Sequence, residues 1–240
     1  MSWGALVRGA DLSHAPGRGG DQFIPRPEAA APGRPAPWAA LPEARRVFDR
    51  DGLVAALGAA DGPRPSPVER AGVRPSAVLA PLYEHDGELH IVLTRRAKHL
   101  RAHRGEVSFP GGAVEPGESP VEGALREAFE EVALDPSSVE VIGELDHLQT
   151  FTSRSFIVPF VGLLPGRPTL VPSPDEVDAV LHVPVRELLL DEVFREERWG
   201  LEPLARPLWF FELVGDTVWG ATAAMLRNLL ALGTGTAWRD

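Results

Sequence analysis

One segment, residues 109–134, constrains the fold and chemistry of this chain more than any other. It opens with a Phe-Pro-Gly-Gly turn and continues into an uninterrupted helical pattern over residues 120–132. At about 100° per residue, the apolar positions share one arc of this helix and the acidic positions share an opposing arc. The apolar arc holds Ala124, Leu125, Ala128, Phe129 and Val132, and the acidic arc holds Glu127, Glu130 and Glu131. We therefore expect one face to pack on a sheet and the other to present three carboxylates.

These three carboxylates are one turn apart, where like charges destabilise a helix unless a cation compensates them. The chain has no cysteine, so a metal would bind to oxygen or histidine ligands. Carboxylate oxygens are preferred by hard cations, which favours Mg²⁺. Taken singly, glutamates on a helix are more often a solvated surface.

Residues around the acidic cluster fit a supporting role. Arg126 precedes it, and Glu118 lies eight residues before Arg126. An Arg–Glu pair there would orient the carboxylates from outside the metal site. Gly111 and Gly112 permit a tight turn and a close approach of the backbone to a phosphate or a metal ion.

The rest of the chain predicts a mixture of strands and helices, which indicates an α/β sandwich. Asp86-Gly87 lies between two apolar runs and is a strong signal for a hairpin. The predicted strands are residues 77–83, 89–93, 139–145, 156–164, 179–183 and 208–214, and a further helix is predicted at 221–232.

We divide the chain into three parts. Residues 1–40 contain six Pro and six Gly and are expected to be irregular or draped over the domain. Residues 41–70 are expected to form a helix over 41–60, with Val47, Phe48, Val54 and Leu57 available for burial, followed by a proline-rich linker. The main domain is expected to span residues 71–240. For residues 1–70, a cap over the active site, a homodimer contact and a simple tether all remain open.

Charge and hydropathy narrow the class of partner. The formal charge of −10 argues against a protein that wraps nucleic acid. No segment predicts a membrane span or a secretory signal, so we expect a cytoplasmic protein with no membrane partner. Residues 94–105, the basic segment, are an exception, because they hold several cations and no acid. Such a segment is commonly a solvated loop, or it binds a small anionic ligand.

The spacing Gly112-x5-Glu118-x7-Arg126-Glu127-x2-Glu130-Glu131 resembles the signature of the Nudix hydrolase family. The chain departs from that signature at Ala128, where the family has a larger apolar residue, and at Ala133, where it has glycine. Alanine in a left-handed helix cap costs about 1 kcal/mol, so we expect a changed helix end beside an intact metal site.

A second resemblance covers the basic segment and the turn after it. Leu93-Thr94-Arg95-Arg96-Ala97, followed at three-residue intervals by Arg101, Gly105 and the Phe-Pro-Gly-Gly turn, is similar to the extended motif of the coenzyme A pyrophosphatase branch. One motif position differs, because Val92 stands where that branch has leucine. Residues 1–70 lie outside both resemblances.

The resemblance implies a Nudix-type α/β/α sandwich with a mixed sheet and a catalytic loop-helix-loop. It also implies Mg²⁺ or Mn²⁺ bound by Glu127, Glu130 and Glu131, and a coenzyme A substrate cleaved to 4'-phosphopantetheine and adenosine 3',5'-bisphosphate. Glu130 and Glu176 are the candidates for the general base. The expected substrate-binding residues are Arg96, Arg101, Arg104, Gly111 and Gly112.

Two alternatives remain open at this point. The same chemistry would serve NADH, ADP-ribose or nucleoside triphosphates, so the nucleotide substrate is not settled by the motifs. The fold would also serve a non-catalytic ligand sensor, although a sensor does not need three mutually repelling carboxylates.

Overall fold

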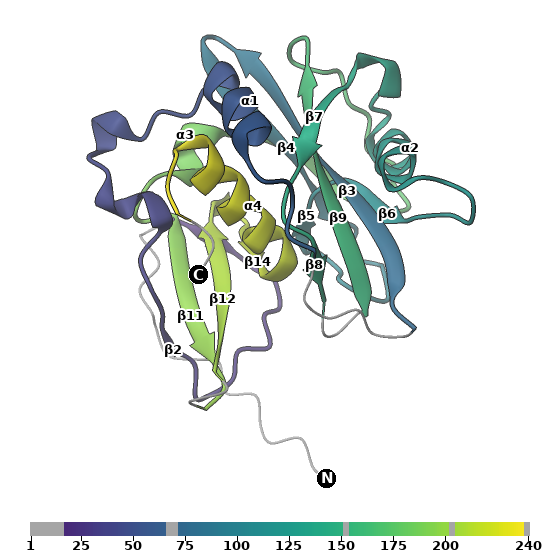
Figure 1. Cartoon of the computed structure of the whole chain (residues 1–240). Coiled ribbons are helices and arrows are strands. Elements are labelled where there is room, and N and C mark those ends of the chain that lie inside the picture. Colours follow the sequence, from purple (N-terminus) through teal and green to yellow (C-terminus); the bar gives the residue numbers. More distant parts are fainter. Residues whose placement is uncertain (1–16, 66–71, 151–153, 202–204, 238–240) are drawn as a thin grey trace.

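The computed structural model describes residues 17–65, 72–150, 154–201 and 205–237. Its centre is a mixed sheet with the strand order β10-β4-β3-β9-β7 (Figure 1). Strands β3 and β9 are parallel, and the other pairs along this path are antiparallel. The strands are β3 (Arg74–His85), β4 (Glu88–Arg96), β7 (Glu140–Glu144), β9 (Ser155–Leu164) and β10 (Val177–Pro184). Five of the six predicted strands are therefore confirmed in this sheet.

The predicted hairpin joins β3 to β4. His85 pairs with Glu88, which leaves Asp86 and Gly87 as a two-residue turn. Both turn residues have positive φ, 52° and 76°. This is the conformation that Asp-Gly favours and that matches the twist of the flanking strands. Three short strands extend the sheet at the other end of β3: β5 (Val107–Ser108), β6 (Gly111–Ala113) and β8 (Leu148–Gln149).

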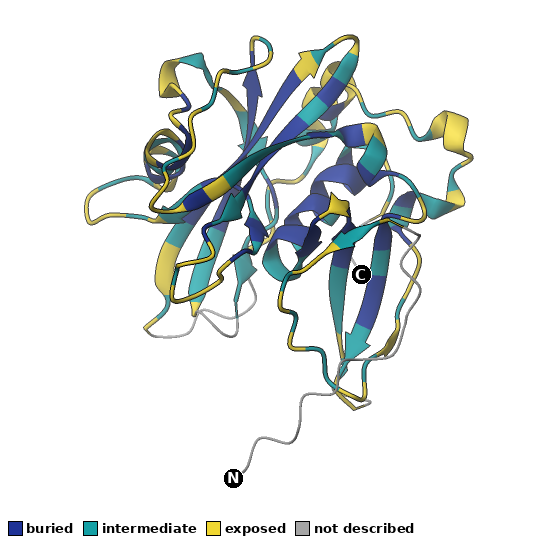
Figure 2. Cartoon of the chain, turned by 180° about the vertical axis from the view of Figure 1, so that it is seen from behind, coloured by how far each residue is buried: buried dark blue, intermediate teal, exposed yellow. Residues whose placement is uncertain are grey.

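Helices cover both faces of the main sheet, which confirms the α/β/α sandwich (Figure 1). Helix α2 (Pro120–Val132) packs on one face with a cluster that includes Leu79 and Val92. Helices α1 (Arg50–Ala59) and α4 (Gly220–Gly233) lie over the other face, with a larger cluster. Buried positions follow these strands and the inner side of α4 (Figure 2).

A second sheet, with the order β14-β12-β11-β2, packs against α4. It consists of β2 (Ala31–Pro32), β11 (Phe194–Trp199), β12 (Arg206–Glu212) and β14 (Thr217–Trp219). The predicted strand 208–214 overlaps β12 and the short β13 (Val214–Gly215). Strand β11 and the short helix α3 (Val185–Leu188) were not predicted. The sequence Arg-Glu-Glu-Arg in β11 reads as surface, yet Glu197 is 1% exposed because arginines and a tryptophan bond to it.

The described part of the N-terminal region, from residue 17, is mostly irregular, yet it is built into the fold. Strand β1 (Gly19–Gly20) pairs with β13, and β2 pairs with β11. Trp38, in the short 3-10 helix η1 (Pro37–Ala40), is fully buried and stacks on Phe211 at a ring-centroid distance of 6.3 Å. This segment therefore contributes to the core.

The helix predicted for residues 41–60 is wrong in its first half. A 3-10 turn, η2 (Glu43–Arg45), comes first, and α1 begins only at Arg50 because Asp49 caps it by accepting from Gly52 N at 2.7 Å. Val47 and Val54 are 60% and 41% exposed, so these two are not buried as expected. The turn η3 (Pro136–Ser138) links α2 to β7. Among the described residues, no helix combines the length and apolar character needed to cross a bilayer.

Candidate active site at the acidic helix

Helix α2 has the predicted bounds, because strong local signals define its start. Ser119 accepts from the backbone N–H of Glu122, whose side chain accepts from Ser119 N, and Pro120 occupies the first turn. This capping box satisfies N–H groups that have no partner within the helix.

The buried arc of α2 is rotated from the predicted one. Ala124, Ala128 and Val132 are buried as expected, but Phe129 is 55% exposed. Glu131, expected on the acidic face, is only 2% exposed. At about 100° per residue, Glu131 lies about 20° from Ala124, whereas Phe129 lies about 140° away on the other side. The sheet therefore covers an arc that contains one carboxylate and excludes the phenyl ring.

The C-terminal end of α2 keeps a left-handed cap. Ala133 has φ 56° and ψ 33°, and its N–H donates to Phe129 O at 2.8 Å. Our expectation of a changed helix end was wrong, because alanine adopts the conformation that glycine would favour. The acidic residues precede this cap and keep their helical spacing.

Arg126 joins the loop before the helix to two of the carboxylates. Its Nε and Nη2 donate to the two oxygens of Glu118 at 3.0 and 3.2 Å. Its Nη1 donates to Glu127 at 2.9 Å and to Glu130 at 3.0 Å, and Nη2 also donates to Ala113 O. The bonds to Glu118 come first among the causes that raise the pKa of Arg126, and they lower the pKa of the Glu118 carboxyl.

Glu131 is the most enclosed of the three carboxylates. Gly111 N donates to its Oε2 at 3.3 Å, and Arg96 Nη1 lies 3.6 Å from its Oε1. The pKa of Glu131 is raised to about 8, with burial as the largest cause and the nearby Glu176 and Glu127 acting in the same direction, while Arg96 and the bond from Gly111 N oppose the shift. The surroundings of Glu131 therefore disfavour its charged form.

The two glycines of the turn are required by close contacts. Gly111 has φ 151°, and a Cβ there would lie 2.4 Å from Ala77 O. A Cβ on Gly112 would lie 2.5 Å from the carboxyl carbon of Glu127. The turn thus brings its backbone directly against the acidic helix.

Glu127 and Glu130 differ in exposure. Glu127 is partly buried, and burial is the largest cause of a raised pKa, with Arg126 acting in the opposite direction. The Glu130 side chain is 57% exposed and is held by Arg126. Within the described ranges, no three acidic or histidine side chains are grouped closely enough to ligate one ion. The three carboxylates therefore do not converge on one point in this arrangement.

A turn before β10 brings Glu176 to the same place. Ser173 N donates to Glu131 O at 2.8 Å, and Glu176 N closes the turn by donating to Ser173 O at 3.1 Å. The Glu176 carboxylate is close enough to raise the pKa of both Glu127 and Glu131. The structure therefore gathers this residue with the acidic helix, although it is far from the helix in sequence.

The basic segment is anchored beside that turn. Arg96 N donates to Glu106 O at 2.9 Å and Gly105 N donates to Arg96 O at 3.0 Å, which closes the loop. Ala97 N donates to Glu176 O at 2.8 Å. The Nε of Arg96 is buried and has no hydrogen-bond partner among the described residues.

Arg101 and Arg104 are exposed on the loop and make no ion pair with the described part of the chain. Of the two histidines, His99 Nε2 lies 3.1 Å from Asp175 O. His103 Nδ1 lies 3.0 Å from Glu106, whose carboxylate raises the pKa of this histidine. The two exposed guanidinium groups are thus left available to an anion.

Sequence reasoning missed a set of residues on the opposite face of β4. Neighbouring strand residues point to opposite faces, so Arg96 reaches Glu131 while Arg95 reaches Asp216. Asp216 also accepts from Gln22 Nε2 at 2.7 Å. No local pattern reveals this contact, because Gln22 and Asp216 are 194 residues apart in sequence.

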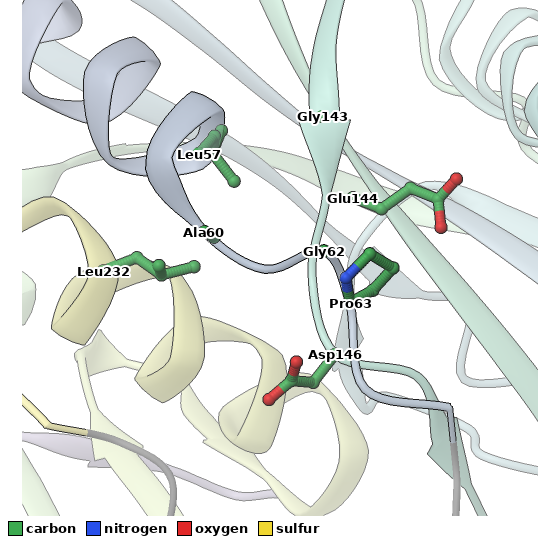
Figure 3. Close-up of a pocket in the computed structure, with 8 residues that line it drawn as sticks. All are labelled: Leu57, Ala60, Gly62, Pro63, Gly143, Glu144, Asp146 and Leu232. Carbon is green, nitrogen blue, oxygen red and sulfur yellow. The ribbon is translucent and has the colours of Figure 1, made fainter.

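A separate cavity of about 260 Å³ lies between α1, α4 and β7 (Figure 3). Apolar side chains such as Leu57 and Leu232 form one wall, and the carboxylate of Asp146 points toward α4. None of the predicted site residues lines it. The acidic cluster, under α2 on the other face of the sheet, is therefore the candidate site.

Comparison with known proteins identifies the family to which the chain belongs. The NUDIX domain model matches residues 73–204, more than half of the chain. Nudix hydrolase 3 of Caenorhabditis elegans is 43% identical over 116 residues, which are 47% of this chain and 48% of that protein. Uncharacterized Nudix hydrolase NudL of Escherichia coli K12 is 38% identical over 164 residues, which are 65% of this chain and 81% of that protein. The chain thus spans about half the length of the worm relative and about four-fifths of the bacterial one.

Solved structures with a related fold are more distant. The Ap4A hydrolase of C. elegans has 17% identity and a TM-score of 0.43, covering 50% of this chain and 86% of that one. A MutT/nudix family protein of Enterococcus faecalis has 18% identity and a TM-score of 0.44, covering 68% and 63%. The family model and the bacterial relatives decide the assignment: the chain belongs to the Nudix hydrolase family.

Proposed function

We propose that the protein hydrolyses the pyrophosphate bond of coenzyme A or a derivative of it, giving 4'-phosphopantetheine and adenosine 3',5'-bisphosphate. The observation that carries the proposal is the contact between Arg96 and Glu131, 3.6 Å apart. It joins the basic segment, whose motif resembles the coenzyme A pyrophosphatase branch, to the acidic helix. A diphosphate in this position would meet cations on one side and the carboxylates on the other.

The residues present fit a divalent cation. Glu127, Glu130 and Glu131 supply hard oxygen ligands. Burial, with Glu176 and Glu127 nearby, raises the pKa of Glu131 to about 8, and a cation bound beside it would favour its charged form. We propose that these carboxylates bind Mg²⁺ or Mn²⁺, with the Gly112 carbonyl as a further ligand. When bound, such an ion neutralises the diphosphate and lowers the pKa of an attacking water. Arg126 and Glu118 would hold the ligands in orientation from behind.

Two carboxylates are suited to take the proton from that water. Glu130 is exposed enough for solvent to reach it, and Arg126 Nη1 donates to its carboxylate at 3.0 Å. Glu176 lies beside Glu127 and Glu131 but is carried on a different element. Arg101 and Arg104 would bind phosphate oxygens of the substrate through forked hydrogen bonds.

A substrate panel tests the proposal. The full-length protein is incubated with Mg²⁺ or Mn²⁺ and with coenzyme A, acetyl-coenzyme A, NADH, ADP-ribose or ATP, and products are resolved by mass spectrometry. We expect kcat/KM to be highest for a coenzyme A form. If a dinucleotide or a triphosphate is turned over faster, it replaces coenzyme A as the proposed substrate. Binding without turnover of any of these compounds would indicate a ligand sensor.

A further inference from the structure

We propose that Gln22 and Asp216 are positioning residues for substrate binding, because they hold the end of β4 from which the basic segment projects. The inference rests on the proposed function, since it concerns the loop that would bind the anionic substrate. It gives a task to a stretch of the N-terminal region, residues 18–34, that lies outside both sequence resemblances. We call this stretch the N-terminal strap.

The strap is fastened along its length. Gly19 N donates to Leu213 O at 2.7 Å, and Gly33 N donates to Glu196 O at 2.7 Å. Between these points Arg26 Nε lies 2.8 Å from Glu197, a carboxylate that is almost fully buried. A segment held at both ends and in the middle can transmit a fixed position to whatever it contacts.

Two neighbouring residues of the strap are linked to the basic segment, Gln22 through Asp216 and Asp21 directly. Gln22 bridges: its Nε2 donates to Asp216 at 2.7 Å, and its Oε1 accepts from Thr217 N at 2.8 Å. Asp216, 4% exposed, then accepts from Arg95 Nη1 through both carboxylate oxygens at 3.3 Å. Next to Gln22, Asp21 pairs with Lys98 at 2.9 Å.

The buried contact between Asp216 and Arg95 should stabilise the basic segment more than the exposed pair of Asp21 and Lys98 does. Lys98 and Asp21 are 64% and 77% exposed, so water screens their attraction. Asp216 is enclosed, and hydrogen bonds to a buried charge are stronger and costly to lose. The loss of Gln22 or of the charge on Asp216 should therefore loosen Arg95, whereas the loss of Asp21 should matter little.

The consequence for substrate binding follows because successive side chains of β4 point to opposite faces of the sheet. Arg95 is fastened on the α4 side of the sheet and Arg96 contacts Glu131 on the α2 side. On the far side of the loop, Lys98 N donates to Asp178 at 3.0 Å. The basic segment is thus held between the strap and the start of β10, with Arg101 and Arg104 projecting from the part in between. We therefore expect the strap to affect the binding of an anionic substrate by the basic segment and not the carboxylates of α2.

Kinetics of Gln22→Ala and Asp216→Asn, in full-length protein with the preferred pyrophosphate substrate, test this role. We expect KM to rise about tenfold, the loss of one hydrogen bond to a charged group, with kcat within about twofold of wild type. The double variant should show less than the product of the two effects. A fall in kcat with unchanged KM would overturn the inference.

Arg18→Gln is the matched control. Arg18 lies on the same strap and, like Gln22, ties it to a carboxylate, here through an ion pair with Glu187 at 2.9 Å, but within the described part of the chain it makes no hydrogen bond or ion pair with the basic segment. We expect this variant to lower the melting temperature as much as Gln22→Ala while leaving KM unchanged. An equal rise in KM in Arg18→Gln would mean that general loosening is responsible, and the proposed role would be wrong.

Hydrogen exchange without substrate separates this inference from the proposed function. We expect amides of residues 98–104 to exchange faster in Gln22→Ala than in wild type, and not in Arg18→Gln. Unchanged exchange in Gln22→Ala would overturn the positioning role whatever the substrate. Faster exchange in a protein that hydrolyses no pyrophosphate would support the link between strap and loop and overturn the proposed function alone.

Discussion

Arg126 donates two parallel hydrogen bonds to Glu118, at 3.0 and 3.2 Å, and a further pair to Glu127 and Glu130. One planar guanidinium thus fixes the loop before α2 and two of the proposed metal ligands at once. A lysine cannot make this pattern of bonds, since all the donors of its ammonium lie on one nitrogen.

Arg126→Lys is therefore expected to lower kcat/KM by about 10- to 100-fold, as for partners that orient metal ligands. The measurement is steady-state kinetics over a series of Mg²⁺ concentrations, and the half-saturating concentration should rise. Glu118→Gln, which keeps one of the two acceptor oxygens and loses the charge, should have a smaller effect. Equal activity of Arg126→Lys and wild type would show that the fork is dispensable.

Glu131→Gln tests the proposed enzyme against a sensor of the same fold. The amide keeps the shape and accepts from Gly111 N, but it is a poor ligand for a hard cation. We expect turnover to fall by more than about 100-fold, beyond the loss from an outer partner, while circular dichroism shows an intact fold. Retained turnover would move the chemistry to a different site.

The buried Glu131 also predicts how stability depends on pH. Its pKa is raised in the folded protein from 4.5 to about 8, with burial as the first cause. The folded state keeps a proton that the unfolded chain releases, so this stabilisation is full below pH 4.5 and is lost as pH rises toward 8. In EDTA, the melting temperature of wild type should fall over this range more steeply than that of Glu131→Gln. Parallel profiles of the two proteins would contradict the assignment.

Ala133→Gly should stabilise the protein. Ala133 has φ 56°, where a Cβ is unfavourable and glycine is not. We expect the free energy of unfolding to rise by about 1 kcal/mol, measured by urea denaturation, with kcat unchanged. Ala128→Gly, a buried helical position without positive φ, is the control and should destabilise the protein. A destabilised Ala133→Gly would mean that the Cβ makes a contact worth more than the strain.

Features that depend on residues close together in the sequence, such as turns and helix ends, were predicted correctly. The Asp86-Gly87 hairpin and the bounds of α2 follow from turn and capping chemistry within a few positions, and the structure has both. The family motif likewise identified Glu118 and Arg126 as a pair, because their contact spans eight residues.

Contacts between distant segments could not be predicted in this way. Strand β11 was missed because the partners that neutralise Glu197, such as Arg26, come from another part of the chain. The burial of Glu131 depends on how α2 is rotated on the sheet, which periodicity alone leaves undefined. The domain bounds and the roles of the site residues stay predictions.

Strands β3 and β9 are neighbours in the sheet and run parallel, although β4, α2 and β7 lie between them in the sequence. A ribosome-bound chain from which β9 has not yet emerged would carry the 13-residue helix α2 beside β3 and β4 but without the strand that joins β3 to β7 in the sheet. Glu176 emerges later still. The proposed metal binding and hydrolysis would therefore begin only after synthesis has passed the last strand of the sheet, so truncated products should be inert toward nucleotides.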